Sequence, residues 1–448
     1  MSSGSGRPRW GNPTRLIILS FAVVIGIGTV LLMLPVSSAS GIPPRLIDAV
    51  FTATSAVCVT GLVVVNTASH WSTFGKSVIL ALLQTGGLGL MVFATMHALV
   101  TGRRIGLRER ILLQEQTGQS RLAGLVSLSK RIIIATMVFE LIGAIVLGAA
   151  IGKARNLPFA ESMFQGLFHS VSAFCNAGFD ILGDSLVGFQ SSTAVVLTVS
   201  FLVIFGGLGF HVIVDLYVNR LRWKALSLHS KLVIKMTAGL LAVAAVAFLA
   251  MEWDNPGTLG PQGLKTKLLS SWFQSVTPRT AGFNTIVEQN LRAPAALLTM
   301  VLMFIGASPG GTGGGVKTTT FAVAATMVRT SVGGAHDVEI AKRRLPTDVV
   351  WKALTIILIS LTLVLVSTIL VSGFEQAPFM DVMFEVMSAF GTVGLSRGIT
   401  ASLSSASKVV IMCTMFAGRV GPLSLAIALS RQKGNGKARY PEERVTVG

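Results

Sequence analysis

The chain has 448 residues, of which 51% are hydrophobic and 12% charged, and its mean hydropathy is +0.70. These values are typical of a membrane protein with several spans, so length alone does not predict a number of soluble domains. The net charge of +18 does not indicate a nucleic-acid partner, because most of the 37 Lys and Arg lie in five segments that alternate with apolar spans. The positive-inside rule places these basic segments on the cytoplasmic face of a lipid bilayer.

Each quarter of the chain predicts the same order of elements: a long apolar span, a half-apolar segment of about 12 residues and a second long span. Because about 20 residues are needed to cross the hydrocarbon core, we expect the short segments to be re-entrant half-helices. The sequence therefore predicts an all-α membrane protein with four pseudo-symmetric repeats, eight crossings and both termini in the cytoplasm. In chain order, the segments are 16–34, 46–58 and 73–99; 131–151, 160–175 and 192–218; 231–251, 266–277 and 292–328; and 350–372, 378–390 and 405–430.

Basic segments frame these repeats. No signal peptide is expected, since the apolar run after the basic N-terminus lacks a cleavage site and is long enough to span. The expected boundaries are a cytoplasmic N-terminus at 1–15, repeats at 16–99, 131–218, 231–328 and 350–430, cytoplasmic loops at 100–130, 219–230 and 329–349, and a cytoplasmic tail at 431–448.

Each short segment ends in a similar element that closes with a glycine and a bulky apolar residue. Glycine adopts backbone conformations that turn carbonyl oxygens inward, and the C-terminal end of a half-helix carries partial negative charge. Four such elements on one axis predict a cation pore, whereas the alternative of a simple turn or helix cap does not explain four copies. The elements are TSAVCVTGL at 54–62, SVSAFCNAGF at 170–179, QSVTPRTAGF at 274–283 and MSAFGTVGL at 387–395.

The second long spans carry another repeated motif, and the third quarter departs from it. Three quarters have QTGGLGLM at 84–91, FGGLGFH at 205–211 and FAGRVGPL at 416–423, whereas the third has GASPGGTGGGVKTTT at 306–320. Glycine costs about 1 kcal/mol and proline about 3 kcal/mol per helix position, so we expect the third span to break near its middle. A nucleotide-binding loop is not favoured, because Val316 separates Gly315 from Lys317 and no buried strand precedes.

Arg419 and Glu140 are charged residues well inside apolar spans. Arg419 lies mid-span, where an arginine costs ~2.5–3.5 kcal/mol, so we expect it to face the protein interior or water. The alternative is an arginine that reaches the interface near Arg431. Glu140 is a buried acid for which a hydrogen bond to a neighbouring helix is favoured over an ion site.

These motifs resemble those of the Trk/Ktr/HKT superfamily of potassium transporters, and most of all its Ktr-type membrane subunits (KtrB). The resemblance covers essentially the whole chain. The Ktr type is also favoured because Trk-type relatives carry an extra N-terminal helix pair that is not expected in this sequence. In addition, the tail ARYPEERVTVG at 438–448 is similar to that of Ktr subunits.

The resemblance implies which residues form the ion pathway. Three residues per repeat would form a selectivity filter that binds potassium, namely Val59, Thr60 and Gly61; Asn176, Ala177 and Gly178; Thr280, Ala281 and Gly282; and Thr392, Val393 and Gly394. The first repeat departs slightly, because its threonine directly precedes the glycine.

The resemblance also implies an intramembrane gating loop at 306–317, for which a passive kink is the alternative. Arg419 would lie beside this loop and donate to its carbonyls. Lys317 would do the same or contact solvent at a helix end. The expected gate residues are Gly306, Gly310, Gly311, Gly313, Gly314, Gly315, Lys317 and Arg419.

As a whole, the resemblance implies the membrane subunit of a potassium uptake system in a bacterial cell membrane. It implies a homodimer with one pore per subunit, seated on a cytoplasmic ring that binds adenine nucleotides. K⁺ is then the transported ion, and no tightly bound cofactor is expected in this chain. The alternatives are a sodium-conducting or weakly selective member of the same fold, and a secondary cation carrier, a class that usually shows inverted or two-half repeats. An enzyme is not expected, because paired catalytic carboxylates and a nucleophile motif are lacking and the three cysteines have no metal-ligand spacing.

Overall fold

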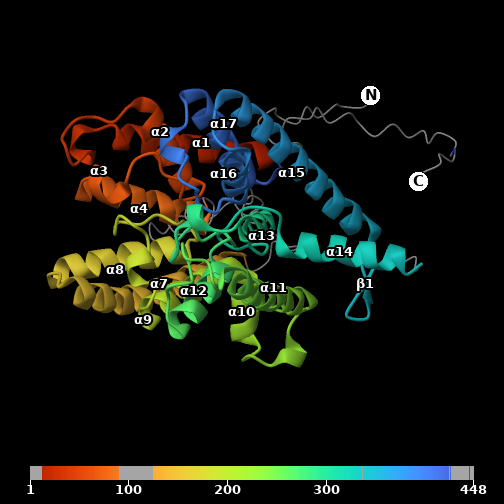
Figure 1. Ribbon diagram of the computed structural model, residues 1–448. Coiled ribbons are helices and arrows are strands. Elements are labelled where there is room, and N and C mark those ends of the chain that lie inside the picture. Colours follow the sequence, from red (N-terminus) through yellow and green to blue (C-terminus); the bar gives the residue numbers. More distant parts are fainter. Residues whose placement is uncertain (1–12, 90–124, 335–336, 423, 425–442, 444–448) are drawn as a thin grey trace.

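The computed structural model is mostly helical, which confirms the expected all-α membrane class (Figure 1). It describes residues 13–89, 125–334, 337–422, 424 and 443. Most of the expected N-terminal segment 1–15, most of the 100–130 loop and nearly all of the 431–448 tail lie outside the described residues. The boundaries proposed for these cytoplasmic segments therefore remain predictions.

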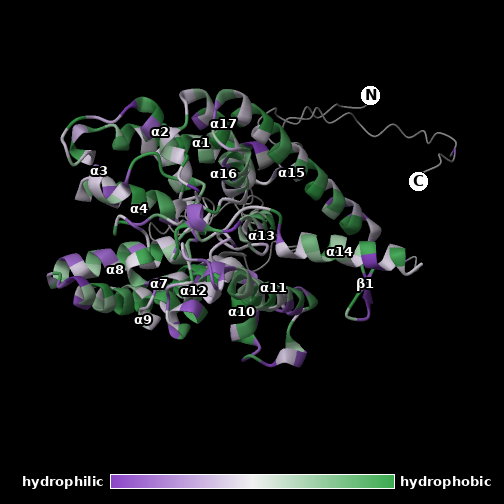
Figure 2. Cartoon of the chain, viewed as in Figure 1, coloured by the Kyte–Doolittle hydropathy of each residue, from purple (hydrophilic) through white to green (hydrophobic). Residues whose placement is uncertain are grey.

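One long helix begins each quarter of the chain. All four are long and apolar enough to cross a membrane, and large side chains such as Leu141 and Val243 are exposed on them. Figure 2 shows hydrophobic residues along α7, α11 and α15, as expected for helices that face lipid. The four helices are α1 (Pro13–Leu32), α7 (Leu125–Arg155), α11 (Leu228–Glu252) and α15 (Thr347–Phe374).

A short helix follows each long one and ends just before the repeat glycine. These four helices match the expected half-helices closely, and each buries at least one phenylalanine completely, such as Phe51, Phe174, Phe273 and Phe390. These buried rings pack the half-helices between the flanking spans. The C-terminal ends of the half-helices meet in the middle of the molecule. They are α2 (Leu46–Val57), α8 (Phe159–Phe174), α12 (Leu264–Val276) and α16 (Phe379–Gly391).

Within the described residues, the second span of each quarter is interrupted or has a helix that ends at a glycine; residues 90–99, 423 and 425–430 of the first and fourth expected spans lie outside the described residues. The first, second and fourth end at glycines with positive φ: Gly89 at 83°, Gly209 at 90° and Gly421 at 95°. These helices are α4 (Thr73–Leu88), α9 (Thr193–Leu208) and α17 (Ser405–Val420). The third consists of α13 (Ala293–Phe304) and α14 (Thr318–Val332), with a loop between them as the glycine run predicts.

The span expected over 192–218 is not one straight helix. The chain turns by 95° at Gly209 into α10 (Phe210–Val218). Within the described residues, four helices meet the length and apolarity of a crossing, or five if this bent pair is one span, so the count of eight crossings remains a prediction.

Small elements complete the chain outside the spans. They are α3 (Thr67–His70), the 3₁₀ turns Pro35–Ser37, Val187–Phe189, Trp223–Ala225, Glu288–Asn290 and Thr400–Ser402, and the antiparallel pair β1 (Glu339–Ile340) and β2 (Arg343–Arg344).

Glycine lets α8 pack closely on α7. A Cβ on Gly166 would lie 2.5 Å from the backbone nitrogen and 2.6 Å from the Cα of Gly148, where no flexible side chain can yield. Gly239 on α11 is the opposite case, because a Cβ there meets nothing within 4 Å.

We expect Gly166→Ala to destabilise the protein by ~1–3 kcal/mol, because the two helix backbones must separate. Gly239→Ala is the matched control and should leave the melting temperature unchanged or raise it, since alanine is the better helix former by about 1 kcal/mol. Thermal unfolding of both variants in detergent measures the difference. Equal melting temperatures would show that α7 and α8 are not in close backbone contact.

Candidate ion pathway

The backbone of the four repeat elements has an unusual conformation. In each, the glycine and the residue two positions before it have positive φ, which for non-glycine residues is uncommon and costs of order 1–3 kcal/mol. One residue with ordinary φ lies between two with left-handed φ. This alternation lets successive carbonyls point to the same side, whereas in an ordinary β-strand they alternate. The values are 57° and 88° for Val59 and Gly61, 56° and 67° for Asn176 and Gly178, 73° and 76° for Thr280 and Gly282, and 49° and 94° for Thr392 and Gly394.

The four glycines form a closed ring, in which each lies against the carbonyl of the residue that precedes the glycine of the next repeat. A Cβ on Gly178 would lie 2.9 Å from the carbonyl oxygen of Ala281 and 2.8 Å from the Cα of Gly282. The same relation continues around the ring, where a Cβ on Gly282 would meet the oxygen of Val393, one on Gly394 that of Thr60, and one on Gly61 that of Ala177. Each repeat therefore supplies a carbonyl to the place where the preceding repeat has no side chain.

A hydroxyl at or just after the end of each half-helix bonds to the strand beside the glycine, in one of two ways. The backbone nitrogens of Gly61 and Gly394 donate to the hydroxyls of Ser55 and Ser388, at 3.1 and 3.0 Å. In the second and third repeats the hydroxyls of Ser172 and Thr277 instead donate to the carbonyl that follows the glycine, in Phe179 and Phe283. In all four repeats, one half-helix hydroxyl thus orients the strand beside its glycine.

Close packing of the second spans on the half-helix ends is also repeated. A Cβ on Gly86, Gly206 or Gly418 would contact the carbonyl oxygen of Val57, Phe174 or Phe390, respectively. Each of these carbonyls lies four residues before a repeat glycine. The motif seen three times in the sequence is therefore the contact that brings a second span against the end of its half-helix.

The loop between α13 and α14 lies directly against the ring. The backbone nitrogen of Gly314 donates to the Thr392 hydroxyl at 2.8 Å, and a Cβ on Gly313 would lie 2.7 Å from the Cβ of Thr280. Thr280 and Thr392 occupy equivalent positions, two residues before their glycines. The loop therefore covers one end of the ring, and its glycines are required by close approach.

Backbone hydrogen bonds anchor this loop to the second repeat. Ser308 and Thr312 donate their backbone nitrogens to the carbonyls of Gly207 and Gly206, at 3.0 and 3.1 Å, and Gly310 accepts from Phe210 at 3.0 Å. Two further backbone bonds stay within the loop, from the nitrogen of Gly306 to the carbonyl of Val316 and from the nitrogen of Gly311 to the carbonyl of Ser308. Gly315 has a positive φ of 67°, which turns the chain.

Two cations bind carbonyls of the same loop. Arg419 on α17 donates from one terminal nitrogen to the carbonyl of Thr312 and from the other to that of Gly86 in the first repeat. Lys317 donates to the carbonyl of Gly313 at 2.7 Å. Arg419 thus faces the protein interior as expected, and Lys317 contacts the loop.

Glu140 of α7 forms hydrogen bonds with two neighbouring helices. Its carboxylate accepts a hydrogen bond from Gln84 of α4 at 3.1 Å, and its backbone carbonyl accepts one from Ser170 of α8 at 2.6 Å. The favoured hypothesis of a hydrogen bond to a neighbouring helix accords with this geometry.

Polar contacts also join neighbouring repeats through the loops that follow the repeat glycines. The first two of these seams use neutral groups there, in addition to the bond from Gln84 of α4 to the Glu140 carboxylate of α7. Between the first and second repeats, Asn66 donates its amide to the carbonyl of Gly183 at 3.1 Å. Between the second and third, Leu186 donates to the carbonyl of Asn284 at 3.0 Å, and Asn284 donates to the Ser185 hydroxyl at 3.1 Å.

The other two seams use charged side chains that the sequence did not reveal as partners. Lys408 of α17 binds Asp48 of α2 at 2.9 Å, and both side chains are largely buried. This pair closes the ring between the fourth and first repeats, which lie side by side in Figure 1. Arg397 links the fourth repeat to the third through the carbonyl of Glu288 at 2.8 Å. A lysine inside an apolar span was the available sequence signal for Lys408.

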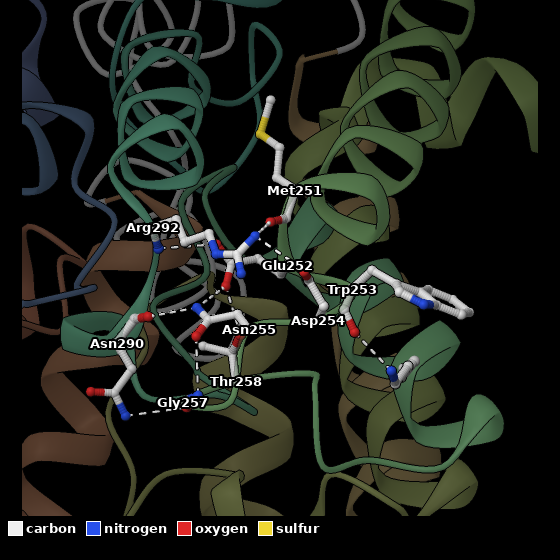
Figure 3. A network of polar contacts seen from close by, with 10 residues as sticks. Met251, Glu252, Trp253, Asp254, Asn255, Gly257, Thr258, Asn290 and Arg292 are labelled. Carbon is white, nitrogen blue, oxygen red and sulfur yellow. Dashed lines mark hydrogen bonds and ion pairs between the residues drawn. The ribbon is translucent and has the colours of Figure 1, made fainter.

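The outer loop of the third repeat is braced separately, by the network in Figure 3. The carboxylate of Glu252, at the end of α11, accepts from Asn255 at 2.5 Å, from Thr258 at 2.6 Å and from the backbone nitrogen of Arg292 at 3.0 Å. The Arg292 guanidinium pairs with Asp254 at 2.9 Å. All these residues belong to one repeat.

Comparison with known proteins accords with this geometry. The family described as TrkH, cation transport protein, matches residues 5–437. The chain belongs to this family. It is therefore a multi-pass membrane transporter and not an enzyme, and the expected relation to the Trk/Ktr/HKT superfamily is confirmed.

Individual relatives match almost end to end. The chain is 41% identical over 436 residues to the Ktr system potassium uptake protein B of Bacillus subtilis, and the alignment covers 97% of each chain. It is 38% identical over 443 residues to the potassium/sodium uptake protein NtpJ of Enterococcus hirae, covering 98% of this chain and 97% of that one. In fold it is similar to the potassium transporter TrkH of Vibrio parahaemolyticus, with a TM-score of 0.75, 17% identity, and coverage of 95% of this chain and 86% of that one.

The buried pair of Lys408 and Asp48 provides a test of the seam between the fourth and first repeats. Lys408→Met should destabilise the protein by ~3–5 kcal/mol, because it leaves an unpaired carboxylate in a buried place. The double variant Lys408→Met with Asp48→Leu should recover much of this loss. Thermal unfolding in detergent compares them with Arg344→Gln, which removes an exposed ion pair worth ~0–1 kcal/mol. A double variant no more stable than the single one would contradict the pairing.

Proposed function

We propose that this chain is the membrane subunit of a potassium uptake system, and that K⁺ passes through the ring formed by the four repeat glycines. The observation that carries the proposal is the closed ring itself, in which each glycine leaves room for the carbonyl of the next repeat. Carbonyl oxygens can replace the water shell of potassium. The relatives named as potassium uptake proteins support the same ion.

The charge distribution of the ring favours cations. Four half-helices end beside it, and each C-terminal end carries a partial negative charge of roughly half an elementary charge. In this proposal the filter residues are those expected from the sequence, with Val59, Asn176, Thr280 and Thr392 at the end that faces the loop.

The loop at 306–317 is proposed as the gate. It contacts two of the four residues at that end of the filter, Thr280 and Thr392, so ions that leave the ring meet the loop next. Arg419 ties the loop to the first repeat and places a permanent positive charge on the cation path. Both effects oppose conduction when the loop is in this position.

Regulation is proposed to come from a second protein. The relatives' designation as part of a Ktr system supports a partner, here inferred to be a cytoplasmic nucleotide-binding ring beneath a homodimer of this chain, with both termini on the cytoplasmic side.

A sodium-conducting or weakly selective transporter is the second candidate, because one relative is named for both potassium and sodium uptake. A carrier with alternating access is less favoured, since the repeats run in parallel and are not inverted. Ion flux into proteoliposomes, with K⁺ against Na⁺, separates the two ions.

We expect Gly61→Ser and Gly282→Ser to reduce the preference for K⁺ over Na⁺ by about tenfold or more, equivalent to ~1.4 kcal/mol. A side chain at either position displaces a carbonyl of the neighbouring repeat and distorts the ring. The ratio of K⁺ to Na⁺ flux measures the effect, and Gly239→Ser, at an open position on α11, controls for the substitution itself. Unchanged preference in both filter variants would overturn the filter assignment.

Arg419→Ala should increase K⁺ flux several-fold, because it removes both the charge and the bonds that hold the loop. Arg419→Lys keeps the charge but cannot easily bridge two carbonyls, so its flux should lie between those of the parent and of the alanine variant. Flux is measured per folded protein, which separates gating from yield. A folded alanine variant that conducts no more than the parent would remove Arg419 from the gate.

A further inference from the structure

Arg397 follows the filter glycine of the fourth repeat by three residues, and its side chain leaves that repeat. Its Nε binds Asp381 of α16 at 2.6 Å. Its two terminal nitrogens donate to the backbone carbonyls of Glu288 and Gln289 in the third repeat, at 2.8 and 3.2 Å. The guanidinium therefore engages three acceptors in two repeats, which its planar fork permits and a lysine ammonium does not match.

The contacts continue into the third half-helix. The side chain of Glu288 is buried and accepts two hydrogen bonds from Gln274 of α12, at 3.0 and 3.2 Å. A chain of polar contacts thus runs from Gln274 through Glu288 and Arg397 to Asp381. It joins the two half-helices whose strands carry Gly282 and Gly394.

Arg397 is the polar link at this seam. Among the described residues, the hydrogen bonds that join the outer segments 283–292 and 395–404 all come from its guanidinium. The segments also approach closely: a Cβ on Gly398 would lie 3.7 Å from the Cγ of Gln289 and nearer still to its amide. Charge-assisted hydrogen bonds are roughly twice as strong as neutral ones, so this seam is held firmly.

The environment of Arg397 limits its effect on passing ions. Its side chain is 14% exposed and lies 2.6 Å from the Asp381 carboxylate, which neutralises its charge. Glu288, outside the spans, has its pKa raised to about 7 by burial, while the bonds from Gln274 and the charge of Arg397 lower it. The arginine is therefore placed to set geometry at the filter mouth, and its charge is balanced where it lies.

We propose that Arg397 is a positioning residue for ion selection, which sets the separation of the third and fourth filter strands at their outer ends. The inference rests on the proposed filter function. The four glycines have no side chains that could adjust the spacing between strands, and Gly282 lies directly against the carbonyl of Val393. The distance between Gly282 and Val393 therefore follows from how the third and fourth repeats are held together. Loosening the contact between the third and fourth repeats widens one side of the ring. Sodium ions can then pass with a different number of bound water molecules.

The test compares ion selectivity with transport rate and stability. Arg397→Gln should lower the K⁺ over Na⁺ preference by about threefold to tenfold, the effect of losing charge-assisted hydrogen bonds. Arg397→Lys retains the pair with Asp381 but not both carbonyl contacts, so its preference should be intermediate. Arg292→Gln is the matched control, since Arg292 also binds an aspartate and a carbonyl, those of Asp254 and Met251, but within one repeat. It should select ions as the parent does.

Gly394→Ser separates failure of this inference from failure of the filter. If Gly394→Ser loses selectivity while Arg397→Gln keeps that of the parent, the filter stands and the role of Arg397 is overturned. If Gly394→Ser keeps full selectivity, the filter itself is overturned. Should Arg397→Gln not yield folded protein, Arg397→Lys decides, and a preference equal to that of the parent refutes the proposal.

Discussion

The structure depends on the absence of a side chain at four positions. Each of Gly61, Gly178, Gly282 and Gly394 leaves a space that the carbonyl of the next repeat fills, and the relation closes on itself after four steps. Because the contact is cyclic, no repeat can gain a Cβ here without moving its neighbour. The close packing of the second spans on the half-helix ends follows from the same constraint, since those ends must converge within a few residues of the ring.

The ring is nearly symmetric, but the walls around it are not. Among the described residues, only the third repeat places a loop of its second span against the ring. Its glycines permit close approach, since Gly313 faces Thr280 and Gly314 faces Thr392. The second repeat bends at Gly209 to receive this loop, because Phe210 donates to Gly310. The break between α13 and α14 is thus matched by the bend between α9 and α10.

The parts of this arrangement that could be predicted from the sequence are those with a local signal. The half-helices were predicted because their length and their closing glycines are visible in short windows, and the break after Phe304 because glycine and proline are costly in helices. The bend at Gly209 was missed because FGGLGFH contains no proline and lies within a long apolar span, although the same motif ends α4 at Gly89. The pair of Lys408 and Asp48 could not be predicted, since 360 residues separate its members and only the closure of the four repeats brings them together.

A ring built from backbone cannot set its own diameter, so the contacts between repeats must do so. These contacts differ in strength around the ring. Charged groups join the fourth repeat to both of its neighbours. In the loops that follow the repeat glycines, by contrast, a single exposed amide from Asn66 joins the first and second repeats. On the face covered by the loop, Arg419 binds Gly86 of the first repeat as well as the loop itself. The arginine that holds the loop therefore also restrains the first repeat, and a change in loop position necessarily alters the support of the ring where its outer contacts are weakest.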